Sequence, residues 1–260
     1  MLVAACRMLD SERPESERLI SDPLARLFVD ERAIAAAEAD VHLQQVIPLR
    51  TRYIDDAVHQ FVAAHPRAQI LLLGAGLDCR AYRLTLSAPI YEVDFPDTLH
   101  YKAQAAAKAG LPEPENRIPV PVDMAHVAVP APLEAAGFDR SRPTLVVWEG
   151  VVNYLTNDQA EAVVQQLGDL LAVGSMLVCD YVENSWFNEN FQTSTETLKA
   201  NLRTGGEPLK SGLHDVKATL SANGFDMIDD EAVELLPPRY GRPTKPRFYP
   251  ARIFTAVKAR

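Results

Sequence analysis

The sequence has few of the features that mark disulfide-rich, metal-binding or membrane-spanning proteins. It contains three cysteines in 260 residues, with no Cys-x-x-Cys pair and no zinc-type spacing of cysteine and histidine. These absences argue against a disulfide framework and a metal site, and they suit a reducing compartment. The apolar runs are far shorter than the ~20 residues that cross a bilayer. Apolar Met1–Cys6 is followed at once by acidic Asp10–Glu17, so no secretory signal is expected.

An excess of positive charge is also missing. Lys and Arg number 26 against 35 Asp and Glu, a formal net charge of −9, which argues against broad attraction to nucleic acid or anionic lipid. We therefore expect a cytoplasmic protein with no nucleic-acid or membrane partner. What is present is an ordinary globular composition, 47% hydrophobic and 23% charged, which is enough to bury a sizeable core. The oligomeric state cannot be inferred from these features.

The first 65 residues have a helical pattern. Pro23 is expected in a first helical turn, Pro48 is expected to break the third helix, and His65-Pro66 is expected to end it. The segments with apolar residues at helical intervals are Ser11–Asp30, Arg32–Ala39 and Val41–Ala64.

After Pro66 short apolar runs alternate with helical segments. The runs are Gln69–Leu73, Ile90–Asp94, Ile118–Asp123, Thr144–Glu149 and Ser175–Tyr181. Strands that alternate with helices form right-handed βαβ units and a parallel sheet. Two further strands, near Phe225–Ile228 and Ile253–Val257, are expected to close the sheet.

The pattern predicts an α/β fold of one domain. We expect a Rossmann-like, doubly wound, mostly parallel seven-stranded sheet with N-terminal helices and a helical lid insertion. The expected parts are a helical cap (1–65), a cofactor-binding core (66–181), a lid (182–211) and the C-terminal part of the sheet (212–260). Ligands of such sheets bind beyond the carboxyl ends of the strands.

A glycine turn follows the first strand. Gly74 and Gly76 have no side chain, so a nucleotide could approach the backbone closely here. A glycine turn that is required only for packing would show the same sequence pattern. A dinucleotide site would have a third glycine where Cys79 stands, and Asp78 puts an anion where the pyrophosphate would lie. The turn therefore disfavours NAD or FAD and suits a nucleoside cofactor without phosphate.

Three acids lie at the ends of later strands. Asp94 is placed to accept hydrogen bonds from ribose hydroxyls, or to cap the next helix. Asp123 could accept from an adenine amino group with Met124 on the ring, or be a solvated loop acid. Glu149 ends an apolar strand, so it needs a cationic or hydrogen-bonding partner.

Two arginines precede the first strand. Arg52 and Asp56 have the spacing of an exposed helical ion pair, but an arginine here could also clamp a ligand carboxylate. Local sequence does not decide between these alternatives, or between Arg50 and Arg52.

Together the motifs resemble the leucine carboxyl methyltransferase-like family of class I S-adenosylmethionine-dependent O-methyltransferases. The resemblance covers about Ser11–Tyr181. It is carried, in order, by Arg50–Asp56, Leu73–Leu84, Tyr91–Pro96 and Trp148–Leu155, with the N-terminal Asp22–Ala25.

The resemblance implies an enzyme that uses S-adenosylmethionine and releases S-adenosylhomocysteine. It implies that Arg52 binds the methionine carboxylate and that Glu149 faces the methionine amino group or the sulfonium. The remaining implied contacts are Gly74 and Gly76 beside methionine and ribose, Asp94 on the ribose, and Asp123 and Met124 on the adenine.

The acceptor implied by the resemblance is a small molecule. Family members that methylate a protein C-terminus have a cofactor-contacting lysine near the N-terminus, but every basic residue before Lys102 is arginine. That contact is unmatched here unless an arginine such as Arg26 replaces the lysine. The closer resemblance is to bacterial enzymes of polyketide and related natural-product pathways. Methylation of a protein C-terminus, or nucleoside binding without catalysis, is the alternative.

The acceptor's chemistry decides whether a base is needed. A carboxylate is ionised near neutral pH, whereas a hydroxyl must lose a proton. Candidate bases, each of which also has a plausible structural role, are Tyr154, His126, Tyr181 and His214.

Overall fold

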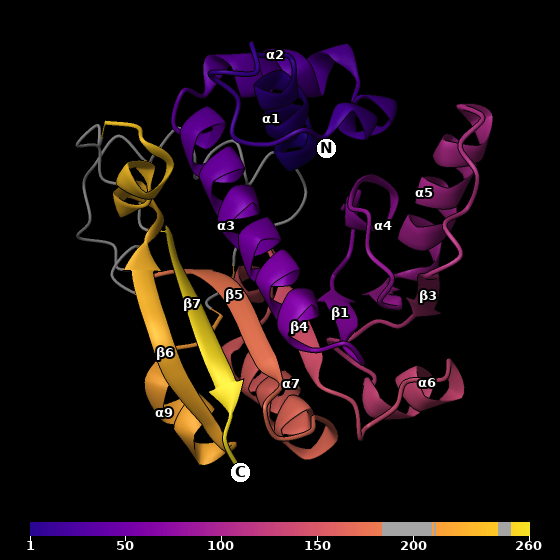
Figure 1. The fold of residues 1–260 in the computed structure, drawn as a ribbon, viewed down its shortest axis with the longest axis vertical. Coiled ribbons are helices and arrows are strands. Elements are labelled where there is room, and N and C mark those ends of the chain that lie inside the picture. Colours follow the sequence, from indigo (N-terminus) through magenta and orange to yellow (C-terminus); the bar gives the residue numbers. More distant parts are fainter. Residues whose placement is uncertain (184–209, 211, 244–250) are drawn as a thin grey trace.

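The computed structural model describes residues 1–183, 210, 212–243 and 251–260, which Figure 1 draws as helices, strands and connecting ribbon. The predicted lid, 182–211, lies almost wholly outside the described residues. None of the helices in the described part of the chain combines the length and hydrophobicity that crossing a bilayer requires.

Seven strands form one sheet in the order β3-β2-β1-β4-β5-β7-β6. β1 to β5 run parallel, and β7 is antiparallel to both β5 and β6. This confirms the predicted Rossmann-like, mostly parallel sheet. The strands are β1 (Gln69–Leu73), β2 (Ile90–Asp94), β3 (Arg117–Pro121), β4 (Thr144–Trp148), β5 (Met176–Val182), β6 (Phe225–Ala232) and β7 (Ala251–Lys258).

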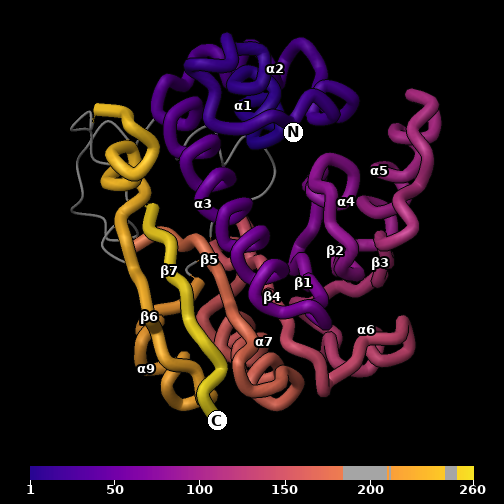
Figure 2. The backbone as a smooth tube through the Cα atoms, viewed as in Figure 1, coloured from indigo at the N-terminus to yellow at the C-terminus, as the bar shows by residue number. Residues whose placement is uncertain are grey.

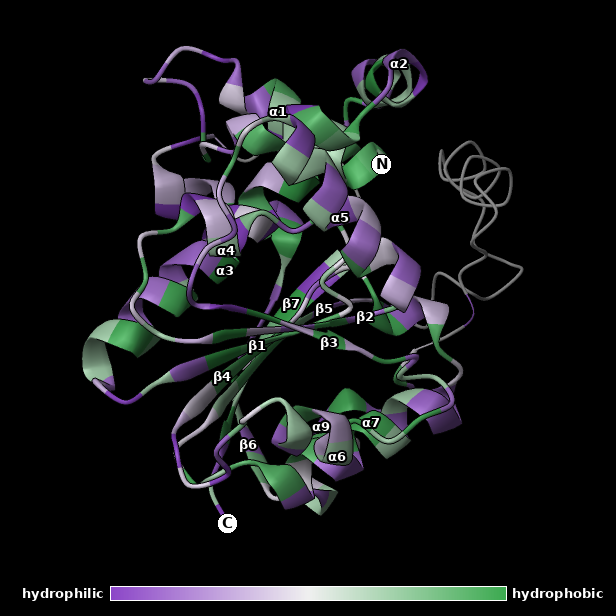
Figure 3. Ribbon diagram, turned by 90° about the vertical axis from the view of Figure 1, so that its right-hand side faces the viewer, coloured by the Kyte–Doolittle hydropathy of each residue, from purple (hydrophilic) through white to green (hydrophobic). Residues whose placement is uncertain are grey.

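Helices cover both faces of the sheet (Figure 3). One face carries α3 (Leu43–Ala64), α4 (Arg80–Arg83) and α5 (Pro96–Lys108), and the other carries α6 (Pro130–Ala135), α7 (Asn157–Leu170) and α9 (Val216–Ala222). The backbone trace shows α3 crossing the sheet from the end where α1 (Leu2–Ser11) and α2 (Glu31–Ala39) lie (Figure 2).

The alternation of side chains along each strand separates two cores. In β1, Ile70 and Leu72 pack into the core beneath α3, whereas Leu71 and Leu73 pack into the core beneath α7. The buried strands are apolar toward both faces, as expected for a parallel sheet covered by helices. The same alternation turns Asp94 at the end of β2, Glu149 just after β4 and Asp180 within β5 toward the face that carries α3.

The N-terminal segment differs from the prediction. A helix over Ser11–Asp30 was expected, but α1 ends at Ser11 and only a short 3₁₀ helix, η1 (Pro23–Phe28), follows. Asp22 caps η1, because its carboxylate accepts a hydrogen bond from the Ala25 N–H at 3.2 Å. The buried positions here are set by contacts with the rest of the cap rather than by helical periodicity.

The expected break at Pro48 is also wrong, because α3 continues through this residue to Ala64. A proline inside a helix removes one backbone hydrogen bond and usually kinks or ends it. Pro48 is buried between Ile47 and Leu49 in the same helix. We infer that the packing of α3 on the sheet outweighs the lost hydrogen bond.

Candidate functional site

The glycine turn after β1 is hydrogen-bonded to Asp94 at the end of β2. Gly74 and Gly76 have φ values of 67° and 44°, in the left-handed region that favours glycine. The Gly76 N–H donates to Asp94 Oδ2 at 2.7 Å, and the Phe95 N–H donates to Asp94 Oδ1 at 2.7 Å. A carboxylate oxygen has two lone pairs, so each oxygen of Asp94 can still accept a ligand hydroxyl.

Replacing Gly74 by alanine is expected to destabilise the protein by about 2 kcal/mol, from left-handed strain and overpacking. A Cβ at this position would lie 2.3 Å from Val151 Cγ2. Gly110→Ala is the matched control, because Gly110 has a similar φ of 74° but nothing within 4 Å of its Cβ position. Urea unfolding should show a larger loss for Gly74→Ala, and adding Val151→Ala should recover part of it. Equal losses at both glycines would contradict this packing.

Arg50 joins the ends of β4 and β5. Its Nε donates to Glu149 Oε1 at 3.0 Å and its Nη1 to Asp180 Oδ2 at 2.7 Å. Thr51 Oγ1 also donates to Glu149 Oε1, at 3.2 Å. Gly150 leaves room for this approach, since a Cβ there would lie 3.3 Å from Arg50 Nη2. One guanidinium and two carboxylates therefore meet beside the Gly150 turn.

Arg80 binds the other oxygen of Glu149. Its side chain is 2% exposed; Nη1 lies 2.6 Å from Glu149 Oε2 and Nε lies 2.8 Å from Asp55 Oδ1. Nη1 also pairs with Asp78 of the glycine turn. Arg83 donates to both oxygens of Asp55, at 2.7 and 2.8 Å. The short helix α4 is thus tied to α3 and to the end of β4.

Two further cations hold the backbone of the glycine turn. Arg7 of α1 donates to the Leu77 carbonyl at 2.6 Å and to Asp22 Oδ2 at 2.8 Å. Lys102 of α5 donates to the Asp78 carbonyl at 2.9 Å and pairs with Glu92 at 2.8 Å. The turn is therefore positioned by side chains from the cap as well as from the core.

The carboxylates of this cluster differ in the direction in which their pKa values are shifted. Burial by itself would raise the pKa of Glu149, but Arg80, Arg50 and Arg7 hold it well below its usual value. Burial would also raise the pKa of Asp78, but Arg80, Arg7 and Arg83 together lower it. Burial raises the pKa of Asp180, where the lowering effect of Arg50 is opposed by the negative charge of Glu149.

The structure does not bring Arg52 to this cluster. Its Nε pairs with Asp56 at 2.8 Å, its Nη1 donates to the Leu19 carbonyl at 3.3 Å, and its guanidinium lies over the Tyr240 ring. Two residues correspond to about 200° around a helix, so Arg50 and Arg52 point to different sides of α3. Arg50, and not Arg52, faces Glu149.

The predicted adenine residues lie beyond β3. Asp123 Oδ1 accepts from the Ala125 N–H at 3.0 Å, and Oδ2 lies 2.7 Å from His126 Nδ1. Met124 is partly buried against the core beneath α7. The carboxylate of Asp123 therefore stabilises the turn of its own loop, and it also contacts the exposed imidazole ring of His126.

The other three candidate bases lie on different elements of the fold. Tyr181 faces the opposite side of the sheet from Asp180 and donates to Asp230 at 3.0 and 3.2 Å. Burial and Asp230 raise the pKa of Tyr181. His214 is exposed beside α9, and its backbone N–H donates to Asn157. Tyr154 is half-buried in the 3₁₀ helix η2 (Val152–Tyr154), a few residues after Glu149.

Sequence reasoning missed several members of the cluster. Asp180 had a detectable signal, since it is a charged residue within the apolar run of β5. Asp55 and Arg80 are also buried, but each occurs among other polar residues and has no comparable signal. Arg26, named as a substitute for the family lysine, is exposed near Met8 Sδ at 3.4 Å, whereas Arg7 reaches the glycine turn.

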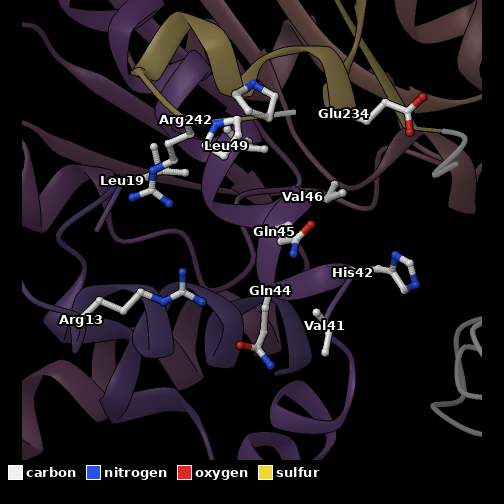
Figure 4. A pocket seen from close by; sticks show the side chains of 12 residues that line it. Arg13, Leu19, Val41, His42, Gln44, Gln45, Val46, Leu49, Glu234 and Arg242 are labelled. Carbon is white, nitrogen blue, oxygen red and sulfur yellow. The ribbon is translucent and has the colours of Figure 1, made fainter. Parts of the chain in front are cut away.

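A cavity of about 440 Å³ opens on another side of α3 (Figure 4). It is lined by Leu19, Val46 and Leu49 together with Arg242. Thr51, which bonds Glu149, points about 200° away from Leu49 around the helix axis. The helix therefore separates this cavity from the charged cluster. In the described part of the chain, no group of three or more His, Cys, Asp or Glu residues is arranged to hold a metal ion.

Comparisons with known structures agree with this fold. A DUF574 family protein from Streptomyces avermitilis superposes with a TM-score of 0.63 at 13% identity, covering 98% of this chain and 96% of that one. The magnesium protoporphyrin IX methyltransferase of Synechocystis PCC 6803, with bound SAH, gives a TM-score of 0.54 at 16% identity, covering 91% and 92%. At such identities the likeness concerns the fold alone.

Comparisons of sequence find relatives with higher identity than these structures. Two relatives carry the name "Putative S-adenosyl-L-methionine-dependent methyltransferase", one from Rhodococcus jostii (35% identical) and one from Mycobacterium tuberculosis (33%). Their alignments cover 68% and 67% of this chain but 63% and 60% of those proteins, so the match spans less than two thirds of their length. The family model for leucine carboxyl methyltransferase matches residues 1–168. The chain belongs to the leucine carboxyl methyltransferase family.

Proposed function

We propose that this protein binds S-adenosylmethionine across the carboxyl ends of β1, β2 and β4 and methylates an oxygen atom of a small molecule. The observation that carries the proposal is the contact of Arg50 with Glu149 at 3.0 Å beside the turn at Gly150. A guanidinium and a carboxylate side by side match the carboxylate and ammonium of an amino-acid tail. Family membership supports the same ligand.

The residues present fit this ligand. Arg50 would bind the methionine carboxylate and Glu149 the ammonium, each exchanging part of its present ion pair for the ligand. Asp94 has free lone pairs at the end of β2 for the ribose hydroxyls, and Asp123 and Met124 would hold the adenine. Among the described residues, a Cβ at Gly76 would have only the Gly74 carbonyl oxygen within 4 Å, at 3.8 Å, so the turn leaves space beside the backbone.

When bound, the sulfonium supplies an activated methyl group for an in-line displacement. The chain then has to orient the acceptor and exclude water. Tyr181 donates to Asp230 on the opposite side of the sheet from Asp180, and His126 engages Asp123. Tyr154 is the candidate base that follows Glu149 by only a few residues. An acceptor that is already ionised, such as a carboxylate, needs no base at all. We therefore favour a carboxylate over a hydroxyl acceptor, on a natural-product or polyketide-type metabolite in the cytoplasm.

Calorimetry with S-adenosylhomocysteine and NADH is expected to show binding of the first and none of the second. The physical reason is the pairing of opposite charges at Arg50 and Glu149, and the carboxylate of Asp78 where a pyrophosphate would lie. The acceptor class would then follow from transfer of a labelled methyl group to extract metabolites, with mass analysis of the product. Binding of NADH alone would instead indicate a dehydrogenase.

A further inference from the structure

Carboxylates outnumber guanidinium groups in the buried ion-pair network around Glu149. Among the described residues its members are Arg7, Arg50, Arg80 and Arg83 with Asp22, Asp55, Asp78, Glu149 and Asp180. The most exposed of these side chains, Asp78, is 15% exposed. With every group ionised, four positive charges face five negative ones. A buried excess charge is costly unless a proton or a ligand compensates it.

Asp180 has few cationic contacts, since in the part of the chain that the structure describes it pairs with Arg50 alone. Its Oδ2 lies 2.7 Å from Arg50 Nη1, but the same guanidinium is shared with Glu149. Its Oδ1 accepts the Gly150 N–H at 2.5 Å. Among the described residues, its neighbours along β5 and across the ladder in β7, Cys179 and Ile253, carry no positive charge. Its pKa is raised, in keeping with this deficit.

We propose that Asp180 is a specificity-determining residue that makes the site prefer the sulfonium donor to its neutral product. This inference rests on the proposed function. S-adenosylmethionine has one carboxylate, one ammonium and one sulfonium, a net charge of about +1 at neutral pH, whereas S-adenosylhomocysteine is net neutral. The donor balances the excess carboxylate of the network and the product does not. The charge lost in methyl transfer thus favours exchange of product for fresh donor.

The same balance predicts a pH dependence that differs between the two ligands. Below the pKa of Asp180 in the free protein, a proton on this residue relieves the excess negative charge, and a bound cation takes over that role. Binding of the donor therefore releases the proton, so donor affinity rises as pH rises through the pKa of Asp180 in the free protein. Product binding leaves the proton in place, and its affinity should change little over the same range.

Calorimetric titration of three ligands tests the proposal. S-adenosylmethionine and sinefungin, which has an ammonium in place of the sulfonium, should bind the native protein more tightly than S-adenosylhomocysteine. Asp180→Asn should reduce this preference by about tenfold, the order expected for a charged partner. Asp139→Asn, at an exposed loop acid paired with Arg67, is the matched control and should leave the preference unchanged.

A second measurement needs no variant. Titrations of the native protein over a series of pH values, in buffers of different ionisation enthalpy, should show proton release with S-adenosylmethionine as the pH falls to the pKa of Asp180, and none with S-adenosylhomocysteine. Equal weakening of all three ligands in Asp180→Asn would overturn the proposal, because it would mean that Asp180 only holds Arg50. Equal proton release with both natural ligands would overturn it as well. If the native protein bound none of the three, the proposed function itself would fail.

Discussion

Replacing Arg50 by lysine is expected to weaken S-adenosylhomocysteine binding by about 10- to 100-fold, the loss typical of a two-point charged hydrogen bond. The guanidinium now bridges Glu149 and Asp180 at 3.0 and 2.7 Å. A lysine keeps the positive charge, so the buried acids remain compensated, but a compact ammonium lacks the planar fork that contacts two carboxylates at once. Calorimetry measures the loss, and thermal unfolding checks that the variant folds.

Arg52→Lys is the matched control for this experiment, since it makes the same change two residues along the same helix. Arg52 pairs with Asp56 at a partly exposed site, so its replacement should change the affinity by less than about twofold, as for other exposed pairs. A large effect at Arg52 with little effect at Arg50 would reinstate the assignment that the family resemblance suggested. It would also contradict the orientation of α3.

Replacing Arg80 by methionine is expected to destabilise the protein by about 3–5 kcal/mol, as when one partner of a buried ion pair is removed. Arg80 is 2% exposed and contacts Asp55, Asp78 and Glu149. Methionine has an unbranched apolar side chain that can occupy much of the space. The expected loss therefore comes mainly from acids left with too little positive charge. Urea unfolding followed by tryptophan fluorescence measures the change.

Arg140→Met is the matched control for Arg80→Met, because it removes an arginine from an ion pair that is not buried. Arg140 contacts Glu134 with both side chains largely exposed, and such pairs contribute little to stability. Its urea midpoint should therefore stay within experimental error of the native value. A comparable shift in both variants would mean that the cluster around Glu149 is solvated rather than buried. An unchanged urea dependence of the unfolding free energy in Arg80→Met would show that the variant keeps a compact native state.

The sheet could be predicted because its signals are local. Each buried strand is a short apolar run such as Ile90–Asp94, and β2 starts and ends where that run does. The N-terminal cap could not be predicted in the same way. There the expected helix over Ser11–Asp30 was replaced by the short 3₁₀ helix η1, and α3 continued through Pro48. In both places tertiary packing outweighed local propensity.

Part of the candidate site could also be anticipated. Gly74 and Gly76 do adopt left-handed backbone conformations, and Glu149 does have the cationic partners that its burial required. The roles of Asp94, Asp123 and Met124 toward a cofactor stay predictions. The structure places Arg50 rather than Arg52 beside Glu149, so the role of Arg52 toward the methionine carboxylate also stays a prediction, and Asp180 was not considered as a site residue.

The sequence by itself determined the order along the chain of the strands and of the longer helices between them, the turn at Gly74, and the acids at Asp94 and Glu149. Each of these depends on residues that are neighbours along the chain. Only the tertiary structure decided which arginine meets which acid. Arg50 lies 99 residues from Glu149 and 130 from Asp180. Their contact depends on how α3 is rotated against the sheet, and that rotation is fixed by the packing of the whole core beneath the helix.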